Sequence, residues 1–289
     1  MTLTATEAAD LFRRDPDRLI DVGAGKVAVR TVGTGPDVLF VHGWPVTGAT
    51  FRKLLPHLTP HVTCHLIDLV GTGSSDYDER TPVGIEGHVE AVRRVVDELG
   101  LTDVAVVGHD SGGMIARHAL AGDERVRSMV MIDTELPDGL SWRFTAFIRG
   151  TRLPGFGKVL GWVVGRRRLR RFPLVLGGAF VDNDLLDGEF DEFFLRPLHT
   201  DPVALAAGVR IVDSFEQRFV TELADLHRRI EVPVHLVWGR HDPFFPVDRA
   251  RDHVADFADA RLTVIDDASL FSHEERPAEV ATAILATVR

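Results

Sequence analysis

Cysteine and tyrosine are almost missing from this chain, which holds one of each, Cys64 and Tyr77, in 289 residues. A lone cysteine cannot form an internal disulfide, and this composition is typical of a reducing cytoplasm. No apolar run approaches the roughly 18 residues that a membrane-spanning helix needs. Residues 1–10 lack the basic and apolar stretches of a secretory signal. We therefore expect a cytoplasmic protein with no membrane partner.

Positive charge is also scarce, because 33 lysines and arginines stand against 43 aspartates and glutamates, a net charge of −10. Phosphate backbones are bound by clustered positive charge, so we expect no nucleic-acid partner. One cluster, residues 166–171, holds five arginines, and a charge run of this kind is typical of a solvated helix face. We expect neither a metal nor a cofactor, and self-association as a homodimer stays open.

Apolar strand-like runs alternate with helix-like runs along most of the chain. This alternation predicts an α/β fold, with a mostly parallel sheet covered by helices on both faces. The predicted strands are 19–22, 26–32, 37–41, 62–69, 103–107, 126–132, 234–238 and 262–265. The predicted helices are 47–58, 85–99, 113–121, 203–215, 247–257 and 278–288.

The alternation breaks between residues 137 and 219, where Gly/Pro pairs, aromatic residues and the arginine cluster occur. We expect residues 1–136 and 220–289 to form the core domain and residues 137–219 to form a mainly helical cap over the sheet. Seven phenylalanines of this insertion are candidates for its own core or for a buried apolar pocket. They are Phe144, Phe147, Phe156, Phe172, Phe180, Phe193 and Phe194.

Residues 108–112, Gly-His-Asp-Ser-Gly, lie between a predicted buried strand and a predicted helix. A strand, a sharp turn and a helix together are typical of a nucleophile elbow. Gly108 and Gly112 bracket Asp110, and small residues at these places let the turn close. The frame therefore predicts that Asp110, rather than Ser111, lies at the tip of the turn.

Catalytic groups of an open α/β sheet gather where its strands end. Residues 42–45, His-Gly-Trp-Pro, follow an early strand, so we expect the backbone N–H groups of Trp44 and Ser111 to form an oxyanion hole. His273, in the loop after the last strand, is the candidate base, and Asp242 is the acid that would orient it. The chain order of nucleophile, acid and histidine favours this choice.

Asp133 and Glu135, which follow the strand 126–132, are alternative orienting acids. His109 and His241 are interpreted as structural neighbours of the site.

With these motifs the chain resembles the α/β-hydrolase fold superfamily, and the resemblance covers nearly all of it outside the insertion. The segments 42–45 and 108–110 are similar to the aspartate-nucleophile group of epoxide hydrolases and haloalkane dehalogenases, which includes fluoroacetate dehalogenases. The resemblance implies a two-step reaction. Asp110 would attack a saturated carbon of a small hydrophobic substrate, and water activated by His273 would then hydrolyse the alkyl ester.

The chain departs from that group at two places. Its epoxide hydrolases protonate the opening ring with cap tyrosines, whereas Tyr77 lies before the elbow strand, so His199 is a tentative substitute. Its dehalogenases carry tryptophan or arginine directly after the aspartate, whereas Ser111 stands here. Trp44, Trp142 and Trp162 are candidate halide donors. Because a halide leaves without a proton, we favour hydrolytic dehalogenation, with epoxide opening as the alternative.

Two rival hypotheses keep the fold and change the function. An esterase or lactonase would use Ser111 as its nucleophile, which requires the elbow frame to shift by one residue. A ligand-binding protein without activity would keep the pocket alone. Such a protein has no need for Asp110, Asp242 and His273 together.

Overall fold

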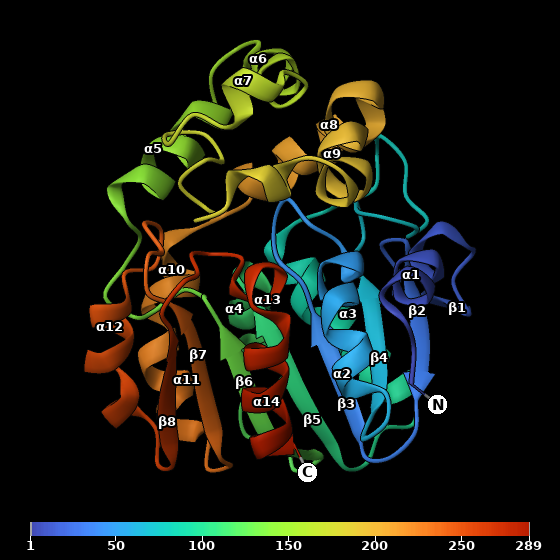
Figure 1. Cartoon of the computed structure of the whole chain (residues 1–289), viewed down its shortest axis with the longest axis vertical. Helices are drawn as coiled ribbons and strands as arrows, with labels where there is room; N and C mark the ends of the chain where they lie inside the picture. The colour runs from blue at the N-terminus through green and yellow to red at the C-terminus, as the bar shows by residue number, and fades with distance from the viewer. Residues whose placement is uncertain (1, 289) are drawn as a thin grey trace.

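The computed structural model describes residues 2–288 and contains one eight-stranded sheet in the order β1-β2-β4-β3-β5-β6-β7-β8 (Figure 1). The first two pairings, β1 with β2 and β2 with β4, are antiparallel, and the remaining neighbours are parallel. The strands are β1 (Arg18–Asp21), β2 (Lys26–Gly33), β3 (Asp37–Val41), β4 (Thr63–Asp68), β5 (Val104–His109), β6 (Val126–Ile132), β7 (Val234–Gly239) and β8 (Ala260–Ile265). The α/β prediction is confirmed.

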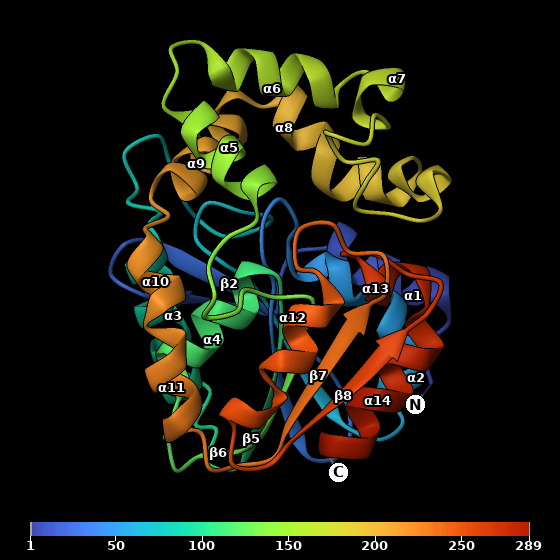
Figure 2. The ribbon, with the colours of Figure 1, turned by 90° about the vertical axis from the view of Figure 1, so that its left-hand side faces the viewer.

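Helices cover both faces of this sheet. Figure 2 shows α3 and α4 on one side and α2 and α14 on the other. The core helices are α1 (Ala5–Asp10), η1 (Leu11–Arg13), η2 (Gly48–Leu54), α2 (Leu55–Leu58), α3 (Ile85–Glu98), α4 (Ser111–Leu120), α12 (Val247–Asp252), η5 (Val254–Asp256), α13 (Ser272–Glu275) and α14 (Pro277–Val288). The predicted helix 47–58 is thus a 3₁₀ segment followed by one α-helical turn.

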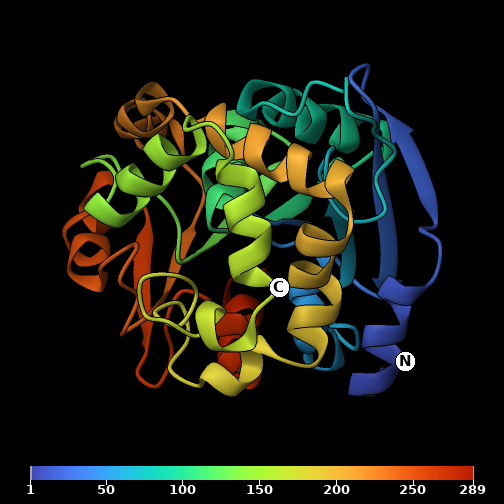
Figure 3. The same ribbon diagram turned by 90° about the horizontal axis from the view of Figure 1, so that it is seen from above.

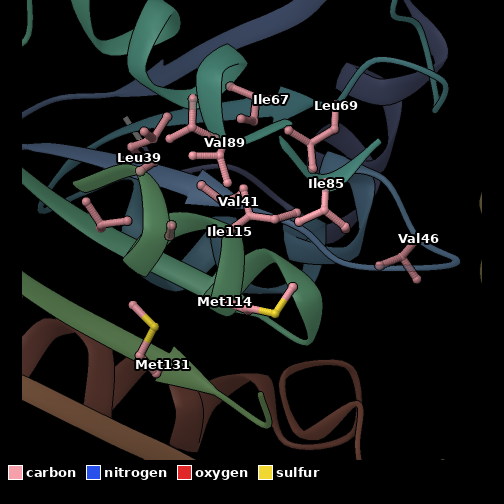
Figure 4. Packing of buried hydrophobic residues seen from close by; sticks show 14 of the residues in the cluster. Leu39, Val41, Val46, Ile67, Leu69, Ile85, Val89, Met114, Ile115 and Met131 are labelled. Carbon is pink, nitrogen blue, oxygen red and sulfur yellow. The ribbon is translucent and has the colours of Figure 1, made fainter. Parts of the chain in front are cut away.

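The central strands are apolar along their whole length because both of their faces are covered. Every residue of β5 is buried. On the α3 side, Val89 of α3 and Ile115 of α4 pack with Leu39 and Ile67 of the sheet (Figure 4). This core holds the elbow between β5 and α4 in place.

Between β6 and β7 the structure contains helices and loops, in residues 137–219 and just beyond. The helices are α5 (Trp142–Thr151), α6 (Phe156–Val164), α7 (Arg167–Arg170), η3 (Asn183–Leu186), η4 (Asp191–Leu195), α8 (Arg196–Thr200), α9 (Pro202–Asp213), α10 (Gln217–Thr221) and α11 (Leu223–Arg229). Figure 3, from above, shows α5 to α9 in yellow-green and orange across one end of the sheet. The division into a core and a cap at residues 137 and 219 stays a prediction.

The sequence predicted that the arginine cluster is a solvated helix face, but only part of it is. Arg166, Arg167 and Arg168 are exposed, whereas Arg170 is buried against Asp187 and Asp191. The buried guanidinium therefore ties α7 to the segment that follows it.

Within residues 2–288, no helix is both long and apolar enough to cross a membrane, and no group of side chains is arranged to hold a metal ion.

Candidate active site

The turn between β5 and α4 presents Asp110 at its tip with φ 51° and ψ −140°. This is a backbone conformation that residues other than glycine seldom adopt. The glycines on either side permit this turn. A Cβ on Gly108 would lie 2.5 Å from the Gly113 Cα, and one on Gly112 would overlap the carbonyl oxygens of Val41 and His42. The backbone strain at Asp110 is thus held by close packing on both sides of it.

The Asp110 carboxyl group lies against the loop after β3. The backbone N–H of Trp44 donates to Asp110 Oδ2 at 2.9 Å. The Ser111 backbone N–H also lies close enough to the Asp110 carboxyl to lower its pKa. Two backbone amides beside one carboxyl group are typical of an oxyanion hole. The residues chosen from the sequence for that role therefore lie together.

Burial raises the pKa of Asp110 well above its usual range, and the negative charge of nearby Glu135 raises it further. The amides of Trp44 and Ser111 oppose this shift because they stabilise the ionised form. The net direction favours a protonated Asp110.

Asp110 and Ser111 lie at the wall of a cavity of about 270 Å³. Its lining is predominantly aliphatic and aromatic, as in many small-molecule sites. The aromatic members are Trp44, Phe144, Phe147, Phe156, Phe215, Phe244, Phe245 and Phe271. Among its lining residues, Asp110 is the one acidic side chain and Arg143 the one positively charged side chain, and no histidine occurs.

His273 does not lie where its place in the chain order predicts. It is completely buried in α13, is not a lining residue of the cavity, and its Nε2 is hydrogen-bonded to Thr50 Oγ1 at 2.7 Å. Its Nδ1 has no partner among the described residues, so no hydrogen bond joins it to Asp242. Burial lowers its pKa to about 3. This placement corrects the expectation that His273 is the base.

The loop after β8 instead presents Leu270 and Phe271 to the cavity. The carbonyl of Leu270 accepts a bond from the His109 ring at 3.0 Å, which fixes the loop over the elbow. Apolar side chains of this loop therefore line the cavity that Asp110 shares, where hydrolysis of an ester would need a proton acceptor. Sequence reasoning missed Leu270, because chain order alone identified His273.

Asp242 lies behind the cavity wall and is almost fully buried. Its Oδ1 accepts the backbone N–H groups of Phe244 at 2.7 Å and Phe245 at 3.1 Å, and both of these residues line the cavity. Its Oδ2 has no partner among the described residues. Burial raises the pKa of Asp242 to about 7. The carboxyl group shapes the wall without orienting a histidine.

The alternative orienting acids, Asp133 and Glu135, are hydrogen-bonded to groups other than His273. Asp133 accepts the Gly239 N–H at 2.7 Å and the Ser272 hydroxyl at 2.6 Å. Glu135 accepts the Thr134 hydroxyl at 3.1 Å, and burial raises its pKa to about 6. Neither is hydrogen-bonded to His273, so neither replaces Asp242 as its orienting acid.

Two tentative substrate-binding residues do not reach the cavity. Trp142 is 69% exposed, His199 is exposed, and neither is a lining residue. Trp44 does line the cavity, and its indole N–H is buried without an acceptor among the described residues. Of the seven candidate phenylalanines, Phe144, Phe147 and Phe156 line the cavity.

Comparison with known proteins gives a consistent family. A family model described as "alpha/beta hydrolase fold" matches residues 36–277. A pimeloyl-[acyl-carrier protein] methyl ester esterase of Xanthomonas campestris is 37% identical over 105 residues, which are 36% of this chain and 39% of that protein. The chain thus spans about two fifths of that relative. The magnesium-chelatase 30 kDa subunit of Rhodobacter capsulatus is 29% identical over 83% of this chain and 82% of its own length.

Solved structures share the fold. The epoxide hydrolase CorEH has a TM-score of 0.76 and 22% identity, covering 93% of this chain and 96% of that chain. A membrane phospholipase A has a TM-score of 0.78 and 22% identity, and the match covers 98% of this chain and 88% of that chain.

Proposed function

We propose, since the chain belongs to the alpha/beta hydrolase fold family, that it is a hydrolase that opens an epoxide of a small hydrophobic molecule with Asp110 as the acid. The observation that carries this proposal is the composition of the cavity wall. One buried carboxyl, bonded to Trp44 N–H through Oδ2, faces an apolar space whose lining residues include no imidazole.

The chemistry follows from a protonated Asp110. Its Oδ2 accepts the hydrogen bond from the Trp44 N–H. The proton on Oδ1 can then be donated to the ring oxygen of the epoxide. One C–O bond of the epoxide breaks as a water attacks the ring carbon. The Asp110 carboxylate, stabilised at that stage by the Trp44 and Ser111 amides, then takes a proton from the attacking water. The product is a diol, and Asp110 returns to its starting state.

An acid is needed at this position because Tyr77 is not a lining residue of the cavity. An opening epoxide develops negative charge on oxygen and gains from a proton donor. A raised pKa favours the protonated carboxyl that can act as this donor, as a carboxylic acid in an apolar site does. The esterase chemistry named for the Xanthomonas relative would instead need a base for Ser111, and no histidine is among the lining residues.

The second candidate is attack of ionised Asp110 on a carbon–halogen bond. It is favoured by the unpartnered indole N–H of Trp44, a donor suited to a departing halide. In this route the alkyl ester at Asp110 would persist, because the cavity lining includes no histidine to activate a water. One halide per protein would then be released in a single burst.

One experiment separates the two routes. A racemic aryl epoxide is turned over once in ¹⁸O water, and the peptide that contains Asp110 is weighed. The proposal predicts label in the diol and none in Asp110, and it predicts that Asp110→Asn loses at least about a hundredfold in rate. Label in the Asp110 carboxyl, or activity that survives Asp110→Asn, would reject it. An alkylated Asp110 after exposure to a haloalkane would support the second candidate instead.

A further inference from the structure

The segment from residue 139 to residue 181 differs in charge from the rest of the protein. It contains nine lysines and arginines and no aspartate or glutamate. The remainder, with 24 basic and 43 acidic residues, has a net charge of −19. We call residues 139–181 the basic segment; it includes α5, α6 and α7, which lie at the end of the molecule remote from the body of the sheet (Figures 1 and 2).

The basic segment also carries most of the exposed large apolar side chains. Of eight such residues in the described chain, Leu19 alone lies outside it. The seven inside it are Trp142, Leu153, Val159, Trp162, Phe172, Leu174 and Val181, which are 49% to 69% exposed. A concentration of this kind on one part of a protein marks an interaction surface.

The cations beside these side chains are largely unneutralised. Four of the nine pair with carboxylates, Arg152 with Asp213 and three on or next to α7 with Asp187. The other five make no ion pair within residues 2–288: Arg143, Arg149, Lys158, Arg166 and Arg168.

Two of these arginines lie against exposed indoles. The Arg166 guanidinium lies 4.1 Å from the ring centre of Trp162, and that of Arg143 lies 5.5 Å from Trp142. Tryptophan with arginine at one surface is the combination that anchors proteins in the headgroup region of a bilayer.

The cavity opens on the same surface. Val159 and Leu174 line the cavity and are also 58% and 61% exposed. The Arg143 side chain lines the cavity beside them. A molecule dissolved in a lipid layer against this surface would meet the cavity mouth without passing through water.

We propose, in place of the expectation of no membrane partner, that the basic segment docks the protein on an anionic lipid surface, with the cavity mouth facing the lipid. Like charges on the segment oppose pairing of two copies through this surface, whereas anionic headgroups complement them. The exposed tryptophans, phenylalanine and leucines fit the acyl boundary below the headgroups. Delivery of a lipid-soluble substrate through the mouth rests on the proposed function; docking itself does not.

Vesicle flotation tests the docking with the full chain. We expect binding to vesicles with about a third phosphatidylglycerol, at least about tenfold weaker binding to pure phosphatidylcholine, and release by high salt. Trp142 and Trp162 should show a blue shift of fluorescence that Trp142→Phe with Trp162→Phe removes, since Trp238 is fully buried and Trp44 is half-buried in the cavity wall.

Two double variants separate the contributions of charge and apolar area. Lys158→Gln with Arg168→Gln, and Leu153→Ser with Trp162→Ser, should each weaken binding at least about tenfold. The matched controls Arg94→Gln, on α3, and Leu19→Ser should bind as the parent does, because both residues are exposed away from the basic segment. Asp110→Asn should also bind normally, so loss of the proposed activity and loss of docking are distinguishable.

Three results would overturn the docking proposal. They are absence of flotation with anionic vesicles, equal binding to neutral vesicles, and double variants that bind like the parent. A dimer in sedimentation velocity that Trp162→Ser dissociates, without vesicle binding, would assign the surface to a second copy instead.

Discussion

Gly43 lies so close to Asp110 that a Cβ at position 43 would stand 2.6 Å from the Asp110 Cβ and 2.8 Å from its Cγ. No side chain can occupy that place unless the carboxyl group moves. Gly43→Ala should therefore displace Asp110 from the Trp44 amide and lower kcat/KM at least about a hundredfold. Gly87→Ala is the matched control, because nothing lies within 4 Å of that site on α3 and the change should stabilise the helix by about 1 kcal/mol. Normal activity in Gly43→Ala would contradict the geometry of the site.

The pH dependence of the reaction should have one direction. A protonated Asp110 is the active form of the acid, and burial raises its pKa well above the usual value. Activity on an epoxide should therefore fall as pH rises through that pKa. Attack by an ionised Asp110 would give the opposite slope. A pH–rate profile of kcat/KM, which reports the free enzyme, distinguishes the two.

His273→Gln should leave activity within about threefold of the parent, because the ring lies outside the cavity. It should lower the free energy of unfolding by about 1 to 3 kcal/mol, since it disturbs the buried bond to Thr50. Steady-state rates and urea unfolding measure these effects. A loss of activity of a hundredfold or more in a folded variant would reinstate His273 as a base.

Leu270→His should place an imidazole at the wall of the cavity that Asp110 shares. Asp242 Oδ2, which has no partner among the described residues, is an available acceptor behind the part of the wall formed by Phe244 and Phe245. We expect a new ionisation near the ordinary histidine pKa of about 6.5 in the pH–rate profile, and turnover of any ester formed at Asp110. Leu270→Asn, similar in size but without a base at that pH, should show neither. Identical pH–rate profiles for the two variants would show that position 270 is not a place from which a base can act on Asp110.

Asp242 should make the protein less stable as pH rises. Its pKa is about 7 in the folded protein, above the ordinary aspartate value of 3.8, so the folded state holds its proton more tightly than the unfolded state. That contribution to stability is complete below pH 3.8 and is lost as pH rises through 7. Between about pH 5 and 7 the parent should lose roughly 2 kcal/mol relative to Asp242→Asn. A pH-independent difference in urea unfolding between the two proteins would refute this.

The sequence predicted elements whose pattern is local. β6 matches its predicted limits, and α3 and β7 differ by one residue, because apolar periodicity and glycine caps set these ends. The tip of the elbow was predictable for the same reason, since the flanking glycines are required by close backbone contacts.

The position of His273 was not predictable, because all four residues of α13 are buried and the pattern therefore shows no outward face for His273. Chain order identifies which loop approaches the cavity but not which of its side chains points there. Cap residues posed a similar difficulty. Trp142 and Phe144 are two positions apart on α5, yet one lies in solvent and the other lines the cavity.

The basic segment carries a charge of +9 and the remainder of the chain one of −19, and this separation gives the molecule an electric dipole. In the field of a negatively charged interface such a dipole turns before contact is made. The orientation of an arriving molecule would then be selected during its diffusion, and mouth-first encounters would outnumber all others at low ionic strength.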